Sequence, residues 1–357
     1  MTLKYPLNLL PGIILAFILY SFSEGLNNII GIELLGYEKS PISTAMIAII
    51  LGLILGNLYN IRTGFLIGLD FTQKYILKLG IICLGIQLKP FAFLEFGKIA
   101  IPLIIICILS VLLVIKLISK KIIIPKRMSY LISVGSTVCG TTAIMAMAPV
   151  INAKKNEVSY AIANITLFGI LSMLIYPYFA NFYFSGESLF IGLFLGTAIH
   201  ETAQVAAAGL IYDQQFNSPE TLNISTVTKL IRNTFLIIMI PLFAYLYSKG
   251  QIKQRKYSII SIFPYFVLGF IAMIIIRNLG DHVFFVHQNE IWSSAVENIK
   301  FLSKIFLTMA MAAIGLSTNL RDIKNMGYKP FLVGFVAMAT VGLISIVTIE
   351  IFINYII

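Results

Sequence analysis

Apolar residues form long runs along the whole chain, and short polar stretches separate them. A membrane-spanning helix needs about 20 mainly apolar residues, with a range of about 17–25, and these runs reach or approach that length. The pattern therefore predicts eleven membrane segments, some of them short enough to be half-spans. They are residues 9–22, 42–59, 75–88, 99–118, 130–151, 158–182, 189–211, 230–247, 259–276, 299–316 and 330–357.

Composition supports the same fold class. The 357 residues are 59% hydrophobic and 11% charged, with a mean hydropathy of +0.93, whereas soluble domains contain about 25% charged residues. We therefore predict an all-α polytopic membrane protein with about 10–11 transmembrane segments, forming a single integral membrane domain over residues 1–357. The first segment lacks a small-residue cleavage site, which favours an uncleaved helix.

Basic residues gather in short loops between the apolar runs. The formal net charge is +11, and the positive-inside rule accounts for it, so no nucleic-acid partner is expected. The loops at residues 116–127 and 249–256 are predicted to be cytoplasmic, and the N-terminus is predicted to lie there too. Three single cysteines without metal-ligand spacing indicate no disulfide framework and no zinc site, and no cofactor or metal is expected.

The chain resembles itself in two places. Residues 74–97 align without a gap with residues 304–327, sharing one lysine and two glycines, and residues 135–145 (GSTVCGTTAIM) align more weakly with residues 196–206 (GTAIHETAQVA). With the basic loops inside, the first pair runs in opposite directions across the membrane. The repeats predict two related halves with inverted topology, residues 42–182 and 187–357, as in secondary transporters.

Two predicted segments have the composition of discontinuous helices. Segments 130–151 and 189–211 contain glycines, which tolerate unusual dihedral angles, and hydroxyl side chains, which can satisfy freed backbone groups. If both were full spans they would point the same way and could not be inverted copies, whereas re-entrant hairpins entering from opposite sides could be. The sequence leaves both arrangements open, because a simple eleven-span count fits the basic loops equally well.

The run GTAIHETAQVAAAGL (196–210) places the ionisable pair His200 and Glu201 in apolar surroundings. A charged side chain at the bilayer centre costs about 2.5–3.5 kcal/mol on insertion scales, and such residues usually mark a transport pathway. We therefore predict that His200 and Glu201 couple transport to protons. The structural alternative is a satisfied polar pair between helices. Zinc hydrolysis is disfavoured, because the run lacks the second histidine of HExxH.

Further candidates are groups that could bind an anion at the helix breaks. Half-helix N-termini present unpaired N–H groups and a positive dipole end, and nearby hydroxyl and amide groups add hydrogen bonds. Lys229 and Arg232 lie three residues apart on one helical face. They could attract an anion, or they could snorkel and set topology. For the Ser and Thr residues the alternative is helix packing. The predicted substrate-binding residues on this basis are Ser136, Thr141, Thr142, His200, Thr202, Gln204, Lys229 and Arg232.

Five motifs together resemble a known family. They are VCGTTAIMAMAPVI (138–151), GTAIHETAQVAAAG (196–209), KLIRN (229–233), FPYFVLGF (263–270) and AIGLSTNL (313–320). They are similar to the YeiH-type conserved bacterial membrane proteins, a family named for sulfate export, and the similarity covers nearly the whole chain. Where the family pattern leads us to expect a small residue followed by Ser, this chain has Thr141 and Thr142, a departure that keeps the hydroxyl content.

The resemblance implies a multi-pass protein of the bacterial inner membrane. It also implies a fold distantly similar to the bile-acid symporters and the sodium/proton antiporters, with discontinuous helices that cross at the membrane midplane. The family signature adds Cys139 and Gly140 to the substrate-binding candidates. Its other positions are Pro149, His200, Gln204, Lys229 and Arg232.

We therefore expect a secondary transporter of a small anion, such as sulfate or a related sulfur-containing or carboxylate anion. It would work by alternating access of a core domain against a scaffold domain in the lipid bilayer, with protons or sodium as candidate coupling ions. No Walker A sequence is present, and we expect no enzymatic activity. Two alternatives stay open: a cation/proton antiporter with Glu201 as the shared ligand, and a membrane sensor or assembly protein. A homodimer is also left open.

Overall fold

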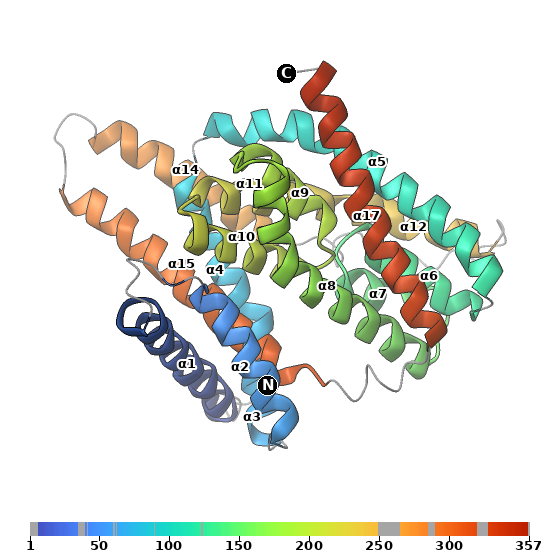
Figure 1. The fold of residues 1–357 in the computed structure, drawn as a ribbon, viewed down its shortest axis with the longest axis horizontal. Coiled ribbons are helices and arrows are strands. Elements are labelled where there is room, and N and C mark those ends of the chain that lie inside the picture. Colours follow the sequence, from blue (N-terminus) through green and yellow to red (C-terminus); the bar gives the residue numbers. More distant parts are fainter. Residues whose placement is uncertain are drawn as a thin grey trace. The chain divides into compact units, whose positions relative to one another are not determined.

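The computed structural model describes most of the chain. The described residues are 6–34, 40, 42–59, 61, 63–88, 90–122, 124–248, 265–284, 290–319 and 328–355. Every regular element in these ranges is helical, and each of the eleven predicted apolar runs contains helix (Figure 1). The all-α prediction is therefore confirmed. The predicted cytoplasmic loop at residues 249–256 lies outside the described residues.

The chain divides into two compact units that alternate along the sequence. The first unit comprises Met1–Phe93, Ala206–Asn223 and Tyr265–Leu320, and the second comprises Leu94–Val205, Ile224–Pro264 and Arg321–Ile357. Three helices continue from one unit into the other: α5 (Pro90–Ile122), α10 (Thr202–Phe216) and α11 (Pro219–Thr234). The single domain and the two repeat-related pieces, 42–182 and 187–357, stay predictions.

The first unit is built around the long helix α15 (Glu290–Ser317). This helix packs against α2 (Thr44–Leu58) and α4 (Leu77–Leu84), and α1 (Pro6–Asn28) packs against α2 and α3 (Thr63–Phe71) (Figure 1). The remaining elements of the unit are the π-helical segments η1 (Ile29–Leu34) and η2 (Thr72–Ile76), the 3-10 turn η3 (Gly85–Gln87) and α14 (Phe266–Phe284).

Glycines let α2 and α15 approach each other closely. A Cβ atom added to Gly52 of α2 would lie 2.7 Å from the carbonyl oxygen of Ala312 and 3.0 Å from the Cα of Gly315 on α15. Small residues at such contacts permit the van der Waals packing that associates helices in lipid, where burial from water supplies no driving force.

The second unit contains α6 (Lys126–Thr137), α7 (Thr141–Met147), α8 (Lys155–Tyr183), α9 (Ser188–Ala198), α12 (Leu236–Ser248) and α17 (Tyr328–Tyr355). Helix α17 packs against α6, α8 and α9, and α8 also packs against α6, α7 and α9. A hydrogen bond of 2.6 Å between the hydroxyl groups of Thr197 and Ser345 joins α9 to α17. Helices α6, α7 and α9 belong to the two predicted discontinuous segments.

Both predicted discontinuous segments are interrupted. Helix α6 ends at Thr137 and α7 begins at Thr141, and α9 ends at Ala198 and α10 begins at Thr202. At a rise of about 1.5 Å per residue, the four half-helices are about 10–23 Å long. Each is shorter than the hydrocarbon core of about 30 Å. A half-helix alone is therefore too short to cross the membrane.

Within the described residues, six helices are long and apolar enough to cross a membrane by themselves, namely α1, α5, α8, α14, α15 and α17. Helices α11 and α12 meet the same criterion only as a pair bent by 43°, which makes a seventh span if the pair crosses the membrane as one. The sequence pattern did not predict this interruption. The predicted 10–11 segments exceed this number, because an apolar run does not distinguish an unbroken span from an interrupted or short helix. The chain is a multi-pass membrane protein whose helices contact lipid.

The close approach of α2 and α15 gives a test of the fold. We expect Gly52→Ala to lower the free energy of unfolding by about 1–3 kcal/mol, because an added methyl group forces backbone shifts. The measurement is thermal unfolding of the purified protein in detergent. Gly64→Ala on α3 is the control, since a Cβ there meets nothing within 4 Å. Equal melting temperatures for the two variants would contradict the packing described.

Candidate functional site

The first helix break depends on Gly140. Its dihedral angles, φ 68° and ψ −124°, lie in a region that residues with a side chain rarely adopt. A Cβ atom on Gly140 would also lie 2.7 Å from Cγ of Glu201, in the second break. The glycine is therefore needed both for the backbone turn and for the contact between the two breaks.

Arg232 on α11 joins the two breaks through their carbonyl groups. Its Nε donates a hydrogen bond of 2.9 Å to the carbonyl oxygen of Thr137, and its Nη2 donates to that of Ser136. On the other side, Nη1 donates to the carbonyl oxygens of Thr197 and, at 3.5 Å, of Ile199. One guanidinium thus connects the C-terminal ends of α6 and α9.

Lys229, one helical turn earlier on α11, makes a second connection of the same kind. Its Nζ donates hydrogen bonds to the carbonyl oxygens of Val138 at 2.9 Å and Ile199 at 3.0 Å, and also to the carbonyl oxygen of His200. The ammonium group therefore lies between the two breaks, just beyond the guanidinium of Arg232.

These contacts follow the weaker of the two sequence repeats. In the alignment of residues 135–145 with 196–206, Ser136 corresponds to Thr197 and Val138 corresponds to Ile199. Arg232 binds the carbonyl groups of the first pair, and Lys229 binds those of the second. The two basic side chains therefore lie where equivalent backbone positions of the two segments converge.

The physical cause of this arrangement is the unpaired backbone at the helix ends. The last four carbonyl groups of a helix lack partners within it, and the C-terminal end carries a negative partial charge of roughly half a unit. Lys229 is 0% exposed and Arg232 is 1% exposed, so the carbonyl groups take the place of water around both cations. The prediction that Lys229 and Arg232 share one helical face is confirmed, and the snorkelling alternative is wrong, because both side chains are buried.

Glu201, in the second break, contacts the start of α7. Its carboxylate accepts hydrogen bonds from the hydroxyl group of Thr141 and, at 3.4 Å, from the backbone N–H of Thr141. A side chain from the second break thus contacts the first residue of the half-helix that follows the first break. Glu201 also interacts electrostatically with Lys229, so the site combines two basic groups with one acidic group.

His200 is buried with unfilled hydrogen-bonding capacity. The residue is 1% exposed, and neither Nδ1 nor Nε2 has a hydrogen-bond partner among the residues that the structure describes. The hydroxyl oxygen of Ser136, near the end of α6, is also buried without a partner among the described residues. Buried polar side chains nearly always have a partner, so these groups are available to a bound solute, a water molecule or a proton.

Two further predicted residues hold the half-helices in place. The hydroxyl oxygen of Thr202 accepts a hydrogen bond of 3.0 Å from the amide of Asn233. The amide of Gln204 donates one of 3.3 Å to the carbonyl oxygen of Thr166, and a Cβ atom on Gly169 would overlap the Gln204 side chain. Both contacts attach the start of α10 to neighbouring helices.

The last two predicted residues differ in burial. Cys139 is buried in the first break, whereas Thr142 is exposed on α7. Thr142 takes no part in the contacts described above. The structure therefore brings nine of the ten predicted substrate-binding residues, together with Glu201, to the two breaks and their supports.

Comparison with known proteins gives matches over nearly the whole chain. Residues 11–334 match the family model described as "Conserved hypothetical protein 698". A UPF0324 membrane protein of Streptococcus agalactiae is 35% identical over 337 residues, which cover 94% of this chain and 96% of that protein. A UPF0324 membrane protein of Fusobacterium nucleatum is 36% identical over 306 residues, 84% of this chain and 88% of that protein. No solved structure matches the chain significantly.

The chain belongs to the UPF0324 family. This is the YeiH-type family to which the sequence motifs point, so that resemblance is confirmed. In this UPF0324 protein three of the five motifs converge: residues 138–151 contain the first break, residues 196–209 contain the second, and residues 229–233 contain the two basic side chains. The motif at residues 263–270 lies partly outside the described residues.

Sequence reasoning missed two supporting residues of the UPF0324 site. Asn233 directly follows Arg232 within the KLIRN motif and lies one helical turn beyond Lys229, so its spacing could have indicated it. Gly169 lies in the apolar segment 158–182. The neighbouring sequence does not show whether this glycine makes room for a glutamine side chain or allows two helices to pack closely.

The stability of the breaks should depend on Lys229. We expect Lys229→Met to lower the free energy of unfolding by more than about 2 kcal/mol, because each buried carbonyl left unpaired costs about 1–3 kcal/mol. Lys155→Met, at the exposed start of α8, should change it by less than about 0.5 kcal/mol. Thermal unfolding in detergent measures both. A Lys229→Met protein as stable as Lys155→Met would show that the carbonyl contacts contribute nothing.

Proposed function

We propose that this UPF0324 protein is a secondary transporter of a small anion, and that the two helix breaks of the second unit form its substrate site. The anion would be sulfate or a related sulfur-containing or carboxylate anion. Transport would proceed by alternating access in the bacterial inner membrane, with the second unit as the core domain, the first unit as the scaffold and the N-terminus in the cytoplasm. We propose no enzymatic reaction.

The observation that carries the proposal is the charge at the breaks. Lys229 and Arg232 are two fully buried basic groups, and Glu201 is the acidic group that interacts with Lys229. Ionised, these three groups leave one positive charge in excess. The carbonyl ends of α6 and α9 offset part of this excess. We propose that a bound anion balances the remainder, because an uncompensated charge is costly inside a membrane.

The unfilled groups of His200 and Ser136 support the same substrate class. A protonated imidazole nitrogen and a hydroxyl group are hydrogen-bond donors, and an oxyanion is an acceptor only. Hydrogen bonds to charged groups contribute about 1.5–3 kcal/mol each. Donors of this kind recognise a small anion without a large apolar pocket.

The carbonyl contacts of Lys229 and Arg232 disfavour the cation/proton antiporter. In transporters with broken helices, unwound backbone carbonyl groups commonly coordinate the transported or coupling sodium ion. Here the carbonyl groups of Val138, Ile199 and His200 already accept hydrogen bonds from Lys229. A sodium ion would have to displace that ammonium group, so we propose protons rather than sodium as the coupling ion.

A flux assay tests the substrate class. In liposomes containing the purified protein, we expect uptake of labelled sulfate or of another anion from a panel of small oxyanions and carboxylates. His200→Ala should reduce it about tenfold to a hundredfold, the equivalent of one hydrogen bond to a charged group. Lys155→Met is the matched control and should retain full flux. Absence of flux for every anion would overturn the proposal and favour a sensor or assembly role. Full flux in His200→Ala would overturn the assignment of the substrate site to the two helix breaks.

Glu201→Gln separates proton coupling from cation exchange. We expect anion flux in the wild type to respond to an imposed pH gradient and not to a sodium gradient, and we expect Glu201→Gln to weaken the pH response because it removes an ionisable group. A pH-sensitive dye inside the liposomes provides the readout. A sodium gradient that drives pH changes in the wild type, abolished by Glu201→Gln, would instead establish the antiporter.

A further inference from the structure

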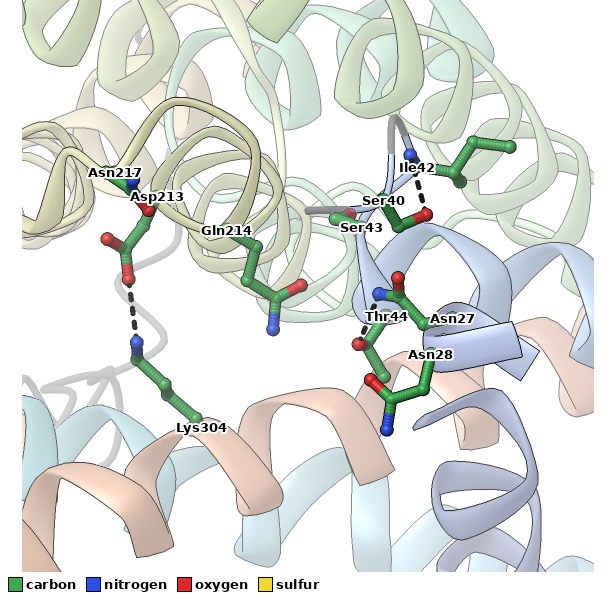
Figure 2. A pocket seen from close by; sticks show the side chains of 10 residues that line it. All are labelled: Asn27, Asn28, Ser40, Ile42, Ser43, Thr44, Asp213, Gln214, Asn217 and Lys304. Carbon is green, nitrogen blue, oxygen red and sulfur yellow. Dashed lines mark hydrogen bonds and ion pairs between the residues drawn. The ribbon is translucent and has the colours of Figure 1, made fainter. Parts of the chain in front are cut away.

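The first unit contains a polar cavity that the helix breaks do not use. Its volume is about 330 Å³, near the lower end of the range of about 300–1,000 Å³ for small-molecule sites. It lies where the end of α1, the start of α2, the end of α10 and the middle of α15 come together (Figure 2). The lining residues are Asn27, Asn28, Ser40, Ile42, Ser43, Thr44, Asp213, Gln214, Asn217 and Lys304.

One acidic and one basic side chain form an ion pair at one side of this cavity (Figure 2). Oδ2 of Asp213 lies 3.3 Å from Nζ of Lys304, and it accepts no hydrogen bond from the residues that the structure describes. The Asp213 side chain is 5% exposed, whereas the Lys304 side chain is 44% exposed. The carboxylate is therefore buried, whereas the partly exposed lysine side chain has room to move away from it.

The other lining groups are almost all amides and hydroxyls, with Ile42 as the apolar exception. Some of them are held by bonds at the rim: the Asn27 amide donates to the Thr44 hydroxyl at 2.7 Å, and the Gln214 side-chain oxygen accepts from the backbone N–H of Ala45 at 3.2 Å. Figure 2 shows the Gln214 side chain between the ion pair and the residues of α1 and α2. Such a lining suits a polar solute and excludes an apolar one.

The start of α2 adds a positive end to one side of the cavity. Ser43 is the N-cap of α2, where its hydroxyl oxygen accepts a hydrogen bond from the N–H of Met46, and Thr44 is the first helical residue. The positive end of the helix dipole favours an anionic group nearby. Lys304 and the start of α2 therefore attract an anionic group, and Asp213 attracts a cationic one.

We propose that this cavity binds a small zwitterion that carries an ammonium group and a carboxylate. Its ammonium group would bind Asp213, and its carboxylate would bind Lys304, which turns away from Asp213 to receive it. A ligand with a single charge would leave one member of the Asp213–Lys304 pair without a counter-charge, whereas a zwitterion matches both. The inference goes beyond anion transport and does not rest on it, because all lining residues belong to the first unit.

Matched ligands test the proposal with the purified full-length protein. The probes are glycine, β-alanine and γ-aminobutyrate, each compared with the carboxylate and the amine of the same chain length: acetate and methylamine, propionate and ethylamine, butyrate and propylamine. A ligand that binds the folded state raises the melting temperature, and isothermal titration calorimetry gives its affinity. We expect at least one zwitterion to bind about tenfold or more tightly than both of its singly charged counterparts.

Variants assign the binding to the cavity. Asp213→Asn and Lys304→Gln should each weaken binding of that zwitterion about tenfold, while Lys300→Gln, on the same helix but outside the cavity lining, should leave it unchanged. His200→Ala should also leave it unchanged, which separates this site from the helix breaks. The proposal is overturned if no zwitterion exceeds its singly charged counterparts, or if binding survives in both cavity variants while they elute as the wild type does in size exclusion.

Discussion

A backbone carbonyl group inside a membrane needs a hydrogen-bond donor, and the two helix breaks of the second unit expose carbonyl groups that lack one in their own helices. Lys229 and Arg232 supply the donors. Between them they bind the carbonyl oxygens of Ser136, Thr137, Val138, Thr197, Ile199 and His200. Without these two side chains, the carbonyl groups of both breaks would lose these hydrogen bonds. The contact between the two breaks, to which Gly140 and Glu201 belong, would then be destabilised.

The same interaction shapes the chemistry of the site. Because the chain provides its own cations at the carbonyl ends, a metal ion is not needed to hold the breaks together. The charges of Lys229, Arg232 and Glu201, together with the unpartnered His200 side chain, are the basis of our proposal that the protein exchanges an anion and a proton. The cavity of the first unit differs in this respect, since Asp213 and Lys304 balance each other. We therefore propose an anion as the ligand of the helix breaks, and a zwitterion for the cavity with its paired charges.

Much of this was predictable from the sequence, for reasons that differ between residues. Apolar runs indicated the helices, and glycines beside hydroxyl residues indicated the two breaks. His200, Glu201, Lys229 and Arg232 stood out because ionisable groups are rare in apolar segments. The carbonyl contacts of Lys229 were not predictable, because the residues on one helix face do not indicate which distant segments pack against that face. Nor was the pairing of Asp213 with Lys304, which are far apart in the chain and became neighbours only through the packing of α10 and α15.

The central claim is that Lys229 and Arg232, rather than a bound ion, occupy the carbonyl ends of both breaks. A cryo-electron-microscopy map of the protein in lipid nanodiscs, prepared in sodium-containing buffer, tests it most directly. We expect side-chain density for both residues reaching the carbonyl groups of α6 and α9, with no ion density between them. A sodium ion coordinated by Val138 and Ile199, with the Lys229 side chain turned away, would contradict the account.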